Sequence, residues 1–433
     1  MRISSSQITS AGVREMLLRQ AEIQHTQLQL STQLRVLTPS DDPVAATAIS
    51  ALDNEIAQLE QFNDNADAAK ASNELEEGIL SSVTSILFRV RELMVSLGNG
   101  TYGKNELNSI GVELQERLKE LVGLGNTQNA NDEYLFSGSK VKTQSFTTDI
   151  NGDVIYNGDQ NQRLLRISSG VVEPISDSGF DVFVNTKNGN GFFSVGSNAG
   201  NTGDATISPG SYQAPPNFLA EPYSITFGVD VNGDTIYTVT GDTSATTLVP
   251  ATLYQEDQDI SFNGITVAVS GTPDGTLPDV LSITPSTSEN VFSVIQTAID
   301  AISDFNDNAA GRAKFTNSLT HVQESLDRNM TSIDNTRGKI GARLNTIESE
   351  VNSNLSLLVT SKSSLSDIRD LDVVEAATRF SQQLTVLEAA QSSFVRVQGL
   401  SLFNFLLFFI YSSLFLISLL FVLNHSNELS CSN

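Results

Sequence analysis

Six residues from Gly98 to Gly103 match the G-x-G-x-x-G spacing that lets a backbone approach a pyrophosphate. In dinucleotide-binding folds this motif follows a β-strand and opens a helix. Here an amphipathic helical pattern precedes it, so the sequence predicts a flexible corner between two helices and no bound cofactor.

Two segments place carboxylate and amide oxygens at alternate positions, as a calcium loop does: Asp149 to Asp153 and Asp230 to Asp234. A calcium loop needs Gly at its sixth position and Glu at its twelfth. The sixth positions are Val154 and Thr235, and neither twelfth position is Glu. Since Asn-Gly between β-type runs is a strong hairpin signal, we expect two type I′ turns and no metal.

The remaining residues that could do chemistry are few. Asp41 and Asp42 are adjacent carboxylates, but no His, Lys or pocket-forming pattern accompanies them, which favours helix capping. His25 and His321 lie in helical runs, no Ser-His-Asp set can be assembled, and Cys431 is the single cysteine. The sequence therefore predicts no catalytic, cofactor or metal site, and a protein that is not an enzyme.

Both ends of the chain carry a helical stripe with alternating four- and three-residue spacing. Such a stripe lets one helix seat its side chains in a partner. We expect the two ends to form a helix pair that is the assembly interface. Its predicted members are Val13, Leu17, Gln24, Leu28, Phe380, Leu384, Leu387, Gln391 and Phe394. Ala21, Ser31, Ala377 and Gln398 continue the same stripes.

Composition bounds the class of protein. With 433 residues the chain is long enough for two or three domains. Fifty acidic residues against 25 basic ones give a net charge of -25, so nucleic acid is not an expected partner. Met1 to Ser10 has neither a basic nor an apolar signal region, which indicates a protein that is cytoplasmic or exported without a cleaved signal.

Apolar residues with helical spacing occur on both sides of residues 132–285. Asp42 looks like an N-cap with Pro43 at the first helical position. The next helix is either one long helix to Leu97 with a phase slip or two helices joined near Asn73, and another helix follows at about residues 104–129. Ser286 to Glu289 has the capping-box spacing before a further helix.

A long helix is expected to reach Leu358, and the serine-rich Ser361 to Ser366 to interrupt it. Asp372 with Glu375 then begins the last helix. Residues 132–285 are rich in Gly, Thr, Asn and Asp and predict an inserted all-β domain. Its β-type runs are Tyr134 to Gly138, Val154 to Gly158, Tyr223 to Val229, Ile236 to Thr240 and Ile265 to Val269.

The expected fold class is α+β and mainly α: a long antiparallel helical bundle formed by both chain ends, with an inserted all-β domain. We divide the chain into N-terminal assembly helix 1–42, first half of the bundle 43–131, β insert 132–285, second half of the bundle 286–371, C-terminal assembly helix 372–404 and apolar tail 405–433.

Three segments resemble the flagellin-type axial proteins of bacterial flagella. Gln27 to Ala46, QLQLSTQLRVLTPSDDPVAA, is similar to the N-terminal signature of that family. The flagellin form of this signature usually has Gly where Gln33 stands and Asp-Asp-Ala where this chain has Asp-Asp-Pro. The Asp-Asp-Pro form resembles the branch of the family that joins hook and filament. Asn131 to Lys140, NDEYLFSGSK, and Ser393 to Asn404, SFVRVQGLSLFN, are similar to the family's helix-to-β corner and C-terminus.

The resemblance implies a structural adaptor without an active site. It implies a homo-oligomeric ring between hook-associated protein 1 and flagellin, an export chaperone, type III export without a cleaved signal, and an extracellular place in the flagellum. Two alternatives stay open: the filament subunit flagellin itself, and a tail-anchored coiled-coil envelope or surface protein.

The apolar tail departs from the family pattern. From Leu402 to Leu423 the clearly polar residues are one Asn and three Ser, a stretch of membrane-spanning length. The composition changes abruptly there, and we expect residues 405–433 to be a translated frameshift or a lost stop codon. The alternative is a true membrane anchor, so the membrane is a partner only if this tail is genuine.

Overall fold

The computed structural model describes residues 5–99, 102–150, 152–213 and 221–428. Two compact units make up the chain. The terminal unit contains residues 1–60 and 356–433, and the central unit contains residues 61–355. This division passes through two long helices, whereas the sequence suggested divisions at their ends.

Long helices dominate both units. They are α1 (Ser5–Thr32), α2 (Pro43–Asn99), α3 (Lys104–Gly125), α4 (Val291–Ser303), α5 (Ala309–Arg369) and α6 (Val373–Glu428). α2 is a single helix without a joint near Asn73, and α5 continues through Ser361 to Ser366. The interruption predicted at those serines is wrong, because their hydroxyls do not end a helix whose neighbouring turns are packed.

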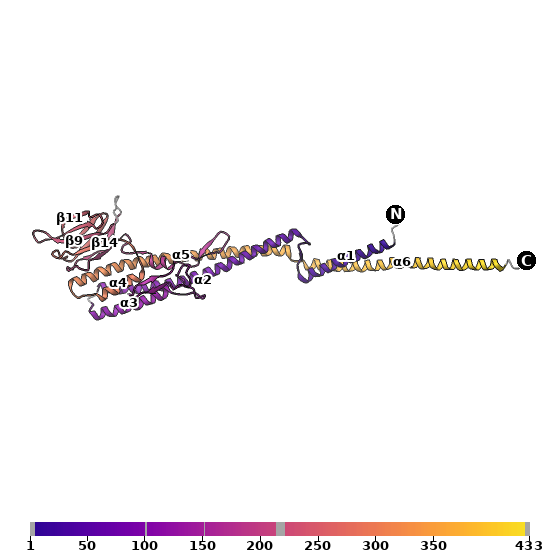
Figure 1. The fold of residues 1–433 in the computed structure, drawn as a ribbon, viewed down its shortest axis with the longest axis horizontal. Coiled ribbons are helices and arrows are strands. Elements are labelled where there is room, and N and C mark those ends of the chain that lie inside the picture. The colour runs from indigo at the N-terminus through magenta and orange to yellow at the C-terminus, as the bar shows by residue number, and fades with distance from the viewer. Residues whose placement is uncertain (1–4, 100–101, 151, 214–220, 429–433) are drawn as a thin grey trace. The chain divides into compact units, whose positions relative to one another are not determined.

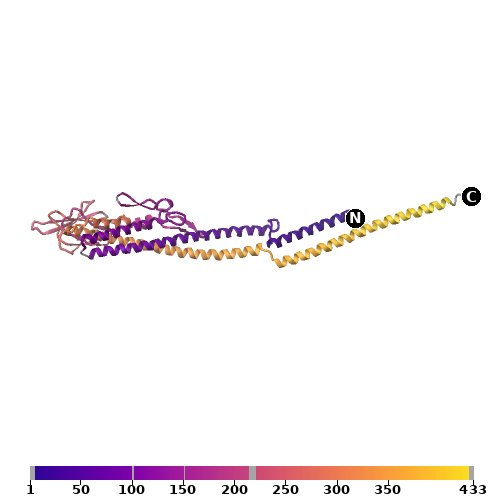
Figure 2. The same cartoon turned by 90° about the horizontal axis from the view of Figure 1, so that it is seen from below.

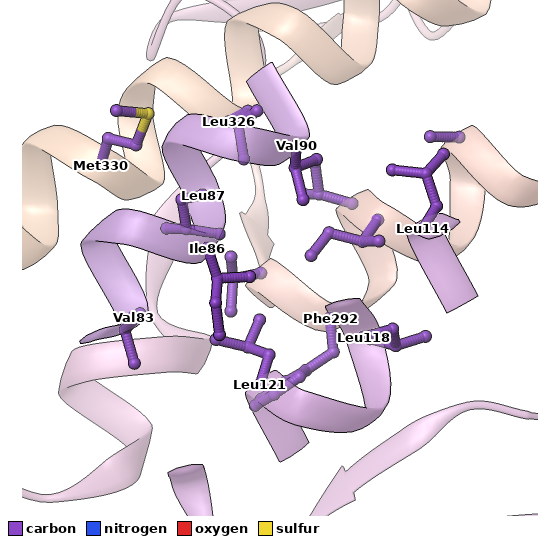
Figure 3. Close-up of a cluster of buried hydrophobic side chains, with 14 of the residues drawn as sticks. Val83, Ile86, Leu87, Val90, Leu114, Leu118, Leu121, Phe292, Leu326 and Met330 are labelled. Carbon is purple, nitrogen blue, oxygen red and sulfur yellow. The ribbon is translucent and has the colours of Figure 1, made fainter. Parts of the chain in front are cut away.

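The helical core lies in the central unit, where α2, α3, α4 and α5 bring their apolar stripes together (Figure 3). The apolar stripe from Ile79 to Leu97 on α2 is buried there. Leu114, Leu118 and Leu121 of α3 meet Phe292 of α4 and Leu326 of α5 in the same cluster. Each such side chain contributes about 1.5–3 kcal/mol by its burial, so this core carries the stability of the unit.

The β insert consists of short antiparallel strands. Those outside the main sheets are β1 (Phe146–Thr148), β2 (Val154–Tyr156), β3 (Leu164–Arg166), β4 (Val172–Pro174), β5 (Thr186–Lys187) and β15 (Ser288–Glu289). A five-stranded sheet has the order β11-β10-β9-β14-β6, with β6 (Phe193–Ser197), β9 (Tyr223–Val229), β10 (Thr235–Gly241), β11 (Thr247–Leu253) and β14 (Val280–Pro285). β13 (Ile265–Ser270) pairs with β12 (Asp259–Phe262), β7 (Thr206–Ile207) and β8 (Ser211–Tyr212).

These elements confirm the fold class predicted from sequence, mainly α with an inserted β domain, but correct some local detail. Tyr134 to Gly138 forms turns and one isolated bridge instead of a strand. The capping box at Ser286 is wrong: Asn290 caps α4 by accepting a hydrogen bond from the Ser293 amide at 2.6 Å, because Ser288–Glu289 is drawn into pairing with β5.

The two Asn-Gly segments are turns between strands, but the type I′ prediction is wrong for Asp230 to Asp234. Type I′ needs positive φ at both central residues. There φ is positive only at Gly233 (+89°), as expected for a bulge glycine. Asn151 of the first segment lies outside the described residues. The type I′ pattern occurs instead at Asn263 (φ +42°) and Gly264 (φ +77°), between β12 and β13.

Within the described part of the chain, no helix is both long and apolar enough to cross a membrane. The backbone of α6 is helical through residues 402–423, but the side chains of 398–405 and 420–428 lie outside the description. Gln398 of the predicted stripe and Cys431 fall there as well.

Candidate functional site

The terminal unit pairs the two ends of the chain: α1 packs along α6, as the ribbons show in two views (Figures 1 and 2). Gly12 marks a close approach, because a Cβ placed on it would lie 2.8 Å from the ring of Phe394. The inward faces follow 4-3 spacing on both helices. They are formed by Gly12, Met16, Arg19, Ile23, Thr26 and Leu30 on α1, and by Ala376, Phe380, Gln383, Leu387, Ala390 and Phe394 on α6.

The predicted interface residues divide into two sets. Phe380, Leu387 and Phe394 are half-buried on the inward face of α6. The others lie off the inward faces and point outward: five of them directly follow an inward residue, and Leu28 lies midway between Thr26 and Leu30. Leu17 is 60% exposed and Leu28 is 55% exposed, and the rest of this set is exposed too: Val13, Gln24, Leu384 and Gln391. An apolar outward stripe therefore stays uncovered on a helix pair that is already formed.

The segment from Gln33 to Leu37 ties α1 to the end of α5. The Leu371 amide donates to the Gln33 carbonyl at 2.9 Å, and the Arg35 amide donates to the Arg369 carbonyl at 2.8 Å. The Arg35 guanidinium donates to the Ile368 carbonyl through Nε (3.0 Å) and Nη2 (2.7 Å). This satisfies a carbonyl that has no partner inside α5. Sequence reasoning missed the role of Arg35, because its acceptor lies 333 positions away.

Asp41 and Asp42 have separate structural roles. Asp41 Oδ2 accepts hydrogen bonds from the amides of Leu37 (3.0 Å) and Thr38 (2.9 Å), and these amides lower the pKa of Asp41. His25 Nε2 lies 3.2 Å from the other oxygen of Asp41. Asp42 Oδ1 accepts from the Ala45 amide at 3.0 Å, and α2 begins at Pro43. Both carboxylates shape the backbone and neither is placed for acid-base chemistry.

Asp372 caps α6 in the same way. Its Oδ1 accepts from the amides of Val374 (2.9 Å) and Glu375 (3.1 Å). The two caps lie among the residues that line a polar cavity of about 800 Å³ in the terminal unit, together with Arg35, His25 and Arg379. Seven of the sixteen lining residues are Asp or Glu, and the lining contains no Ser or Cys that could act as a nucleophile beside His25.

One constellation in the central unit has the residue types of a catalytic triad. Ser194 Oγ lies 2.9 Å from His321 Nδ1, and His321 Nε2 lies 3.4 Å from Glu289. The sequence did not reveal this set, because its members come from β6, α5 and β15. Ser194 is only 6% exposed, so a substrate carbonyl cannot reach its hydroxyl. The Ser325 hydroxyl also donates to Glu289 (3.1 Å), which makes the cluster a polar contact between β insert and α5.

The candidate cofactor and metal segments are used as turns. Gly98 and Asn99 end α2 and Gly103 precedes α3, while residues 100–101 lie outside the described chain. The Asp149 and Asp230 carboxylates accept amides of their own turns, at 2.9 Å from Asp153 and 2.7 Å from Asn232. Among the described residues, no group of three or more His, Cys, Asp or Glu could hold a metal ion.

Helical regions at both ends of the chain that pair with each other, with a β-rich domain inserted between them, define the class of flagellin-type axial proteins. Two family models match the chain: the bacterial flagellin N-terminal helical region over residues 3–141 and the bacterial flagellin C-terminal helical region over residues 323–406. A Phase 1 flagellin of Salmonella naestved is 33% identical, but over 27% of this chain and 22% of its own length. Likeness to flagellin is thus confined to part of the chain.

Likeness to a junction protein extends much further. The crystal structure of flagellar hook-associated protein 3 from Legionella pneumophila is 31% identical with a TM-score of 0.71, covering 74% of this chain and 98% of that one. Flagellar hook-associated protein 3 of Escherichia coli strain K12 is 23% identical over 405 residues, 93% of this chain and 99% of its own. The chain belongs to the flagellar hook-associated protein 3 family.

Proposed function

We propose that copies of this chain form a ring that joins the flagellar hook to the flagellin filament, with hook-associated protein 1 and flagellin as neighbours. The outward stripe of the terminal helix pair carries this proposal. Leu17 and Leu28 lie exposed on a helix whose opposite face is already covered by α6. Apolar side chains in that position gain free energy when a second helix pair covers them.

Export through the flagellar type III apparatus, aided by an export chaperone, is part of the same proposal. It places the protein outside the cell, in the flagellum. Family membership and the similarity to flagellin at both chain ends support this route. Detection of the protein in sheared flagella from wild-type cells, and its loss in an export-deficient strain, would test it.

Deleting the gene tests the junction role against that of filament subunit. If the chain is a junction protein, its deletion leaves the hook in place while flagellin is shed into the medium. A filament subunit, when deleted, leaves no filament and no shed flagellin. The second pattern would overturn the proposal.

Two variants of α1 test the outward stripe itself. Leu17→Glu places a charge in the stripe, whereas Gln27→Glu adds the same charge at an exposed position outside it. We expect both purified variants to keep the helix content of the wild-type chain. Leu17→Glu should cause flagellin shedding in the deletion strain, and Gln27→Glu should restore filaments. Filaments restored equally by both variants would contradict a role for this stripe.

A further inference from the structure

A buried polar node connects three parts of the central unit. Asn73 and Glu76 come from α2, Arg343 comes from α5, and Asp177 follows strand β4. Glu76 is fully buried, and Arg343 and Asp177 are 8% and 6% exposed. Charged groups are rarely this buried unless each has a partner. The way these groups share partners is therefore informative.

Arg343 serves as the cation of the node. Its Nη1 donates to Asn73 Oδ1 at 2.7 Å and its Nη2 to Asp177 Oδ1 at 3.2 Å. Gln162 Nε2 also donates to Asp177 Oδ1, at 2.6 Å. The Asp177 carboxylate is thus paired and hydrogen-bonded, as a buried charge requires.

Among the described residues, no cation lies within ion-pair distance of Glu76, although the charge of Arg343 lowers its pKa. Its two oxygens accept only the Asp177 amide, at 3.1 and 3.2 Å. Glu77, the next residue on α2, pairs with Arg337 of α5 at 2.8 Å, and Glu173 of β4 lies 3.9 Å from Arg343. Arg343 therefore faces carboxylates from two elements, and Glu76 faces like charges. Burial, together with the charge of the Asp177 carboxylate, raises the pKa of Glu76 to about 8.

The node holds the segment from Gln162 to Ser178, which includes the β3–β4 hairpin, against the helices. Its other attachments are modest. A small apolar cluster joins Ile167, with Leu165 and Val171 beside it, to Ala66, Ala69, Ile347 and Val351, and Arg163 pairs with Glu133 at 3.0 Å. The side-chain Nδ2 of Asn65 donates to the Arg166 carbonyl at 2.7 Å, and Nδ2 of Asn354 donates to the Ile167 carbonyl at 2.9 Å. With so few apolar contacts, the hairpin depends on the polar node at its base.

We propose that Glu76 is a proton-controlled lock: its uncharged form holds residues 162–178 on the rod of α2 and α5, and its ionisation releases them. An ionised Glu76 would place a second negative charge, with no cation of its own, against the paired Asp177 carboxylate in a site closed to water. Opening of the hairpin admits water to both carboxylates and relieves this repulsion.

Hydrogen-deuterium exchange on the full chain, at pH 6.5 and pH 9.0 with correction for the intrinsic rate, tests the lock. We expect the protection of residues 162–178 to fall by roughly 30-fold at pH 9.0, since opening becomes tenfold more favourable for each pH unit up to the pKa of about 8 and changes little above it. Protection of α3 should stay the same. Wild-type protection that is equal at the two pH values would overturn the proposal.

Glu76→Gln removes the titrating group and keeps an acceptor for the Asp177 amide, so its hairpin should stay protected at pH 9.0. Glu74→Gln, an exposed change on the same helix, should respond to pH like the wild type. If Glu76→Gln fails to fold, Asp177→Asn provides the test, because it frees Arg343 to neutralise Glu76 and should abolish the response. A wild-type response in either node variant would refute the lock.

Discussion

Gln33 has a left-handed backbone (φ +57°) at the end of α1. Its carbonyl accepts the Leu371 amide, so the strained residue helps to tie the two ends of the terminal unit. A non-glycine residue in this conformation costs about 1–2 kcal/mol. Gln33→Gly removes that cost, but the greater freedom of glycine in the unfolded chain lowers the free energy of unfolding by about 0.5–1 kcal/mol. The net expectation is a stabilisation of about 0.5–1 kcal/mol.

Exchange of the Arg35 and Leu371 amides reports this change directly, because both donate across the same junction. A gain of about 0.5–1 kcal/mol corresponds to roughly two- to fivefold greater protection, since 1.4 kcal/mol is tenfold. Gln33→Val is the matched opposite: a β-branched residue is poorly tolerated at positive φ, and protection should fall. Lower protection in Gln33→Gly, or equal protection in both variants, would refute this account of the junction.

Three further predictions concern other contacts. Asp42→Ala should destabilise the start of α2 by about 1 kcal/mol, whereas Asp42→Asn should cost much less, as exchange of the first amides of the helix would show. Gly138→Ala should cost at least about 2 kcal/mol in chemical denaturation, because φ is +69° and a Cβ would lie 2.2 Å from Asp159 Oδ1. Thermal stability should fall as pH rises from 5 to 8: the hydrogen bond that His321 donates to Glu289 raises the pKa of His321, and burial raises the pKa of Glu324 to about 7. The folded state therefore holds protons that the unfolded state releases, and His321→Gln should flatten the slope.

Sequence reasoning identified the paired ends but placed part of their packing one residue away. It put Val13, Leu17 and Leu384 in the stripe because these are the large apolar residues. The observed inward face instead uses Gly12 and Gln383. A small or polar residue fits a close contact between helices. Hydrophobicity alone therefore does not tell which face of α1 packs on α6 and which face stays free for another contact.

The caps were within reach of sequence reasoning, whereas the buried polar clusters were not. Capping depends on residues within one turn, as at Asp42 and Asp372. Arg343 meets Asn73 across 270 positions, and His321 meets Ser194 across 127. Those meetings depend on the register between long helices and on the position of the β insert, and a single sequence carries no local signal for either.

The difference between the two units bears on how the chain would work. The central unit has a continuous apolar core from four helices. Among the described buried apolar side chains, α1 contributes Ile23 and α6 contributes Ala376. So few buried groups give a helix pair little stability of its own, because isolated helices depend on tertiary packing. Covering Leu17 and Leu28 with a neighbouring copy would add about 1.5–3 kcal/mol for each side chain fully buried. The central unit therefore has the larger stability of its own, and the proposed contact with a neighbouring copy would stabilise the helix pair of the terminal unit most.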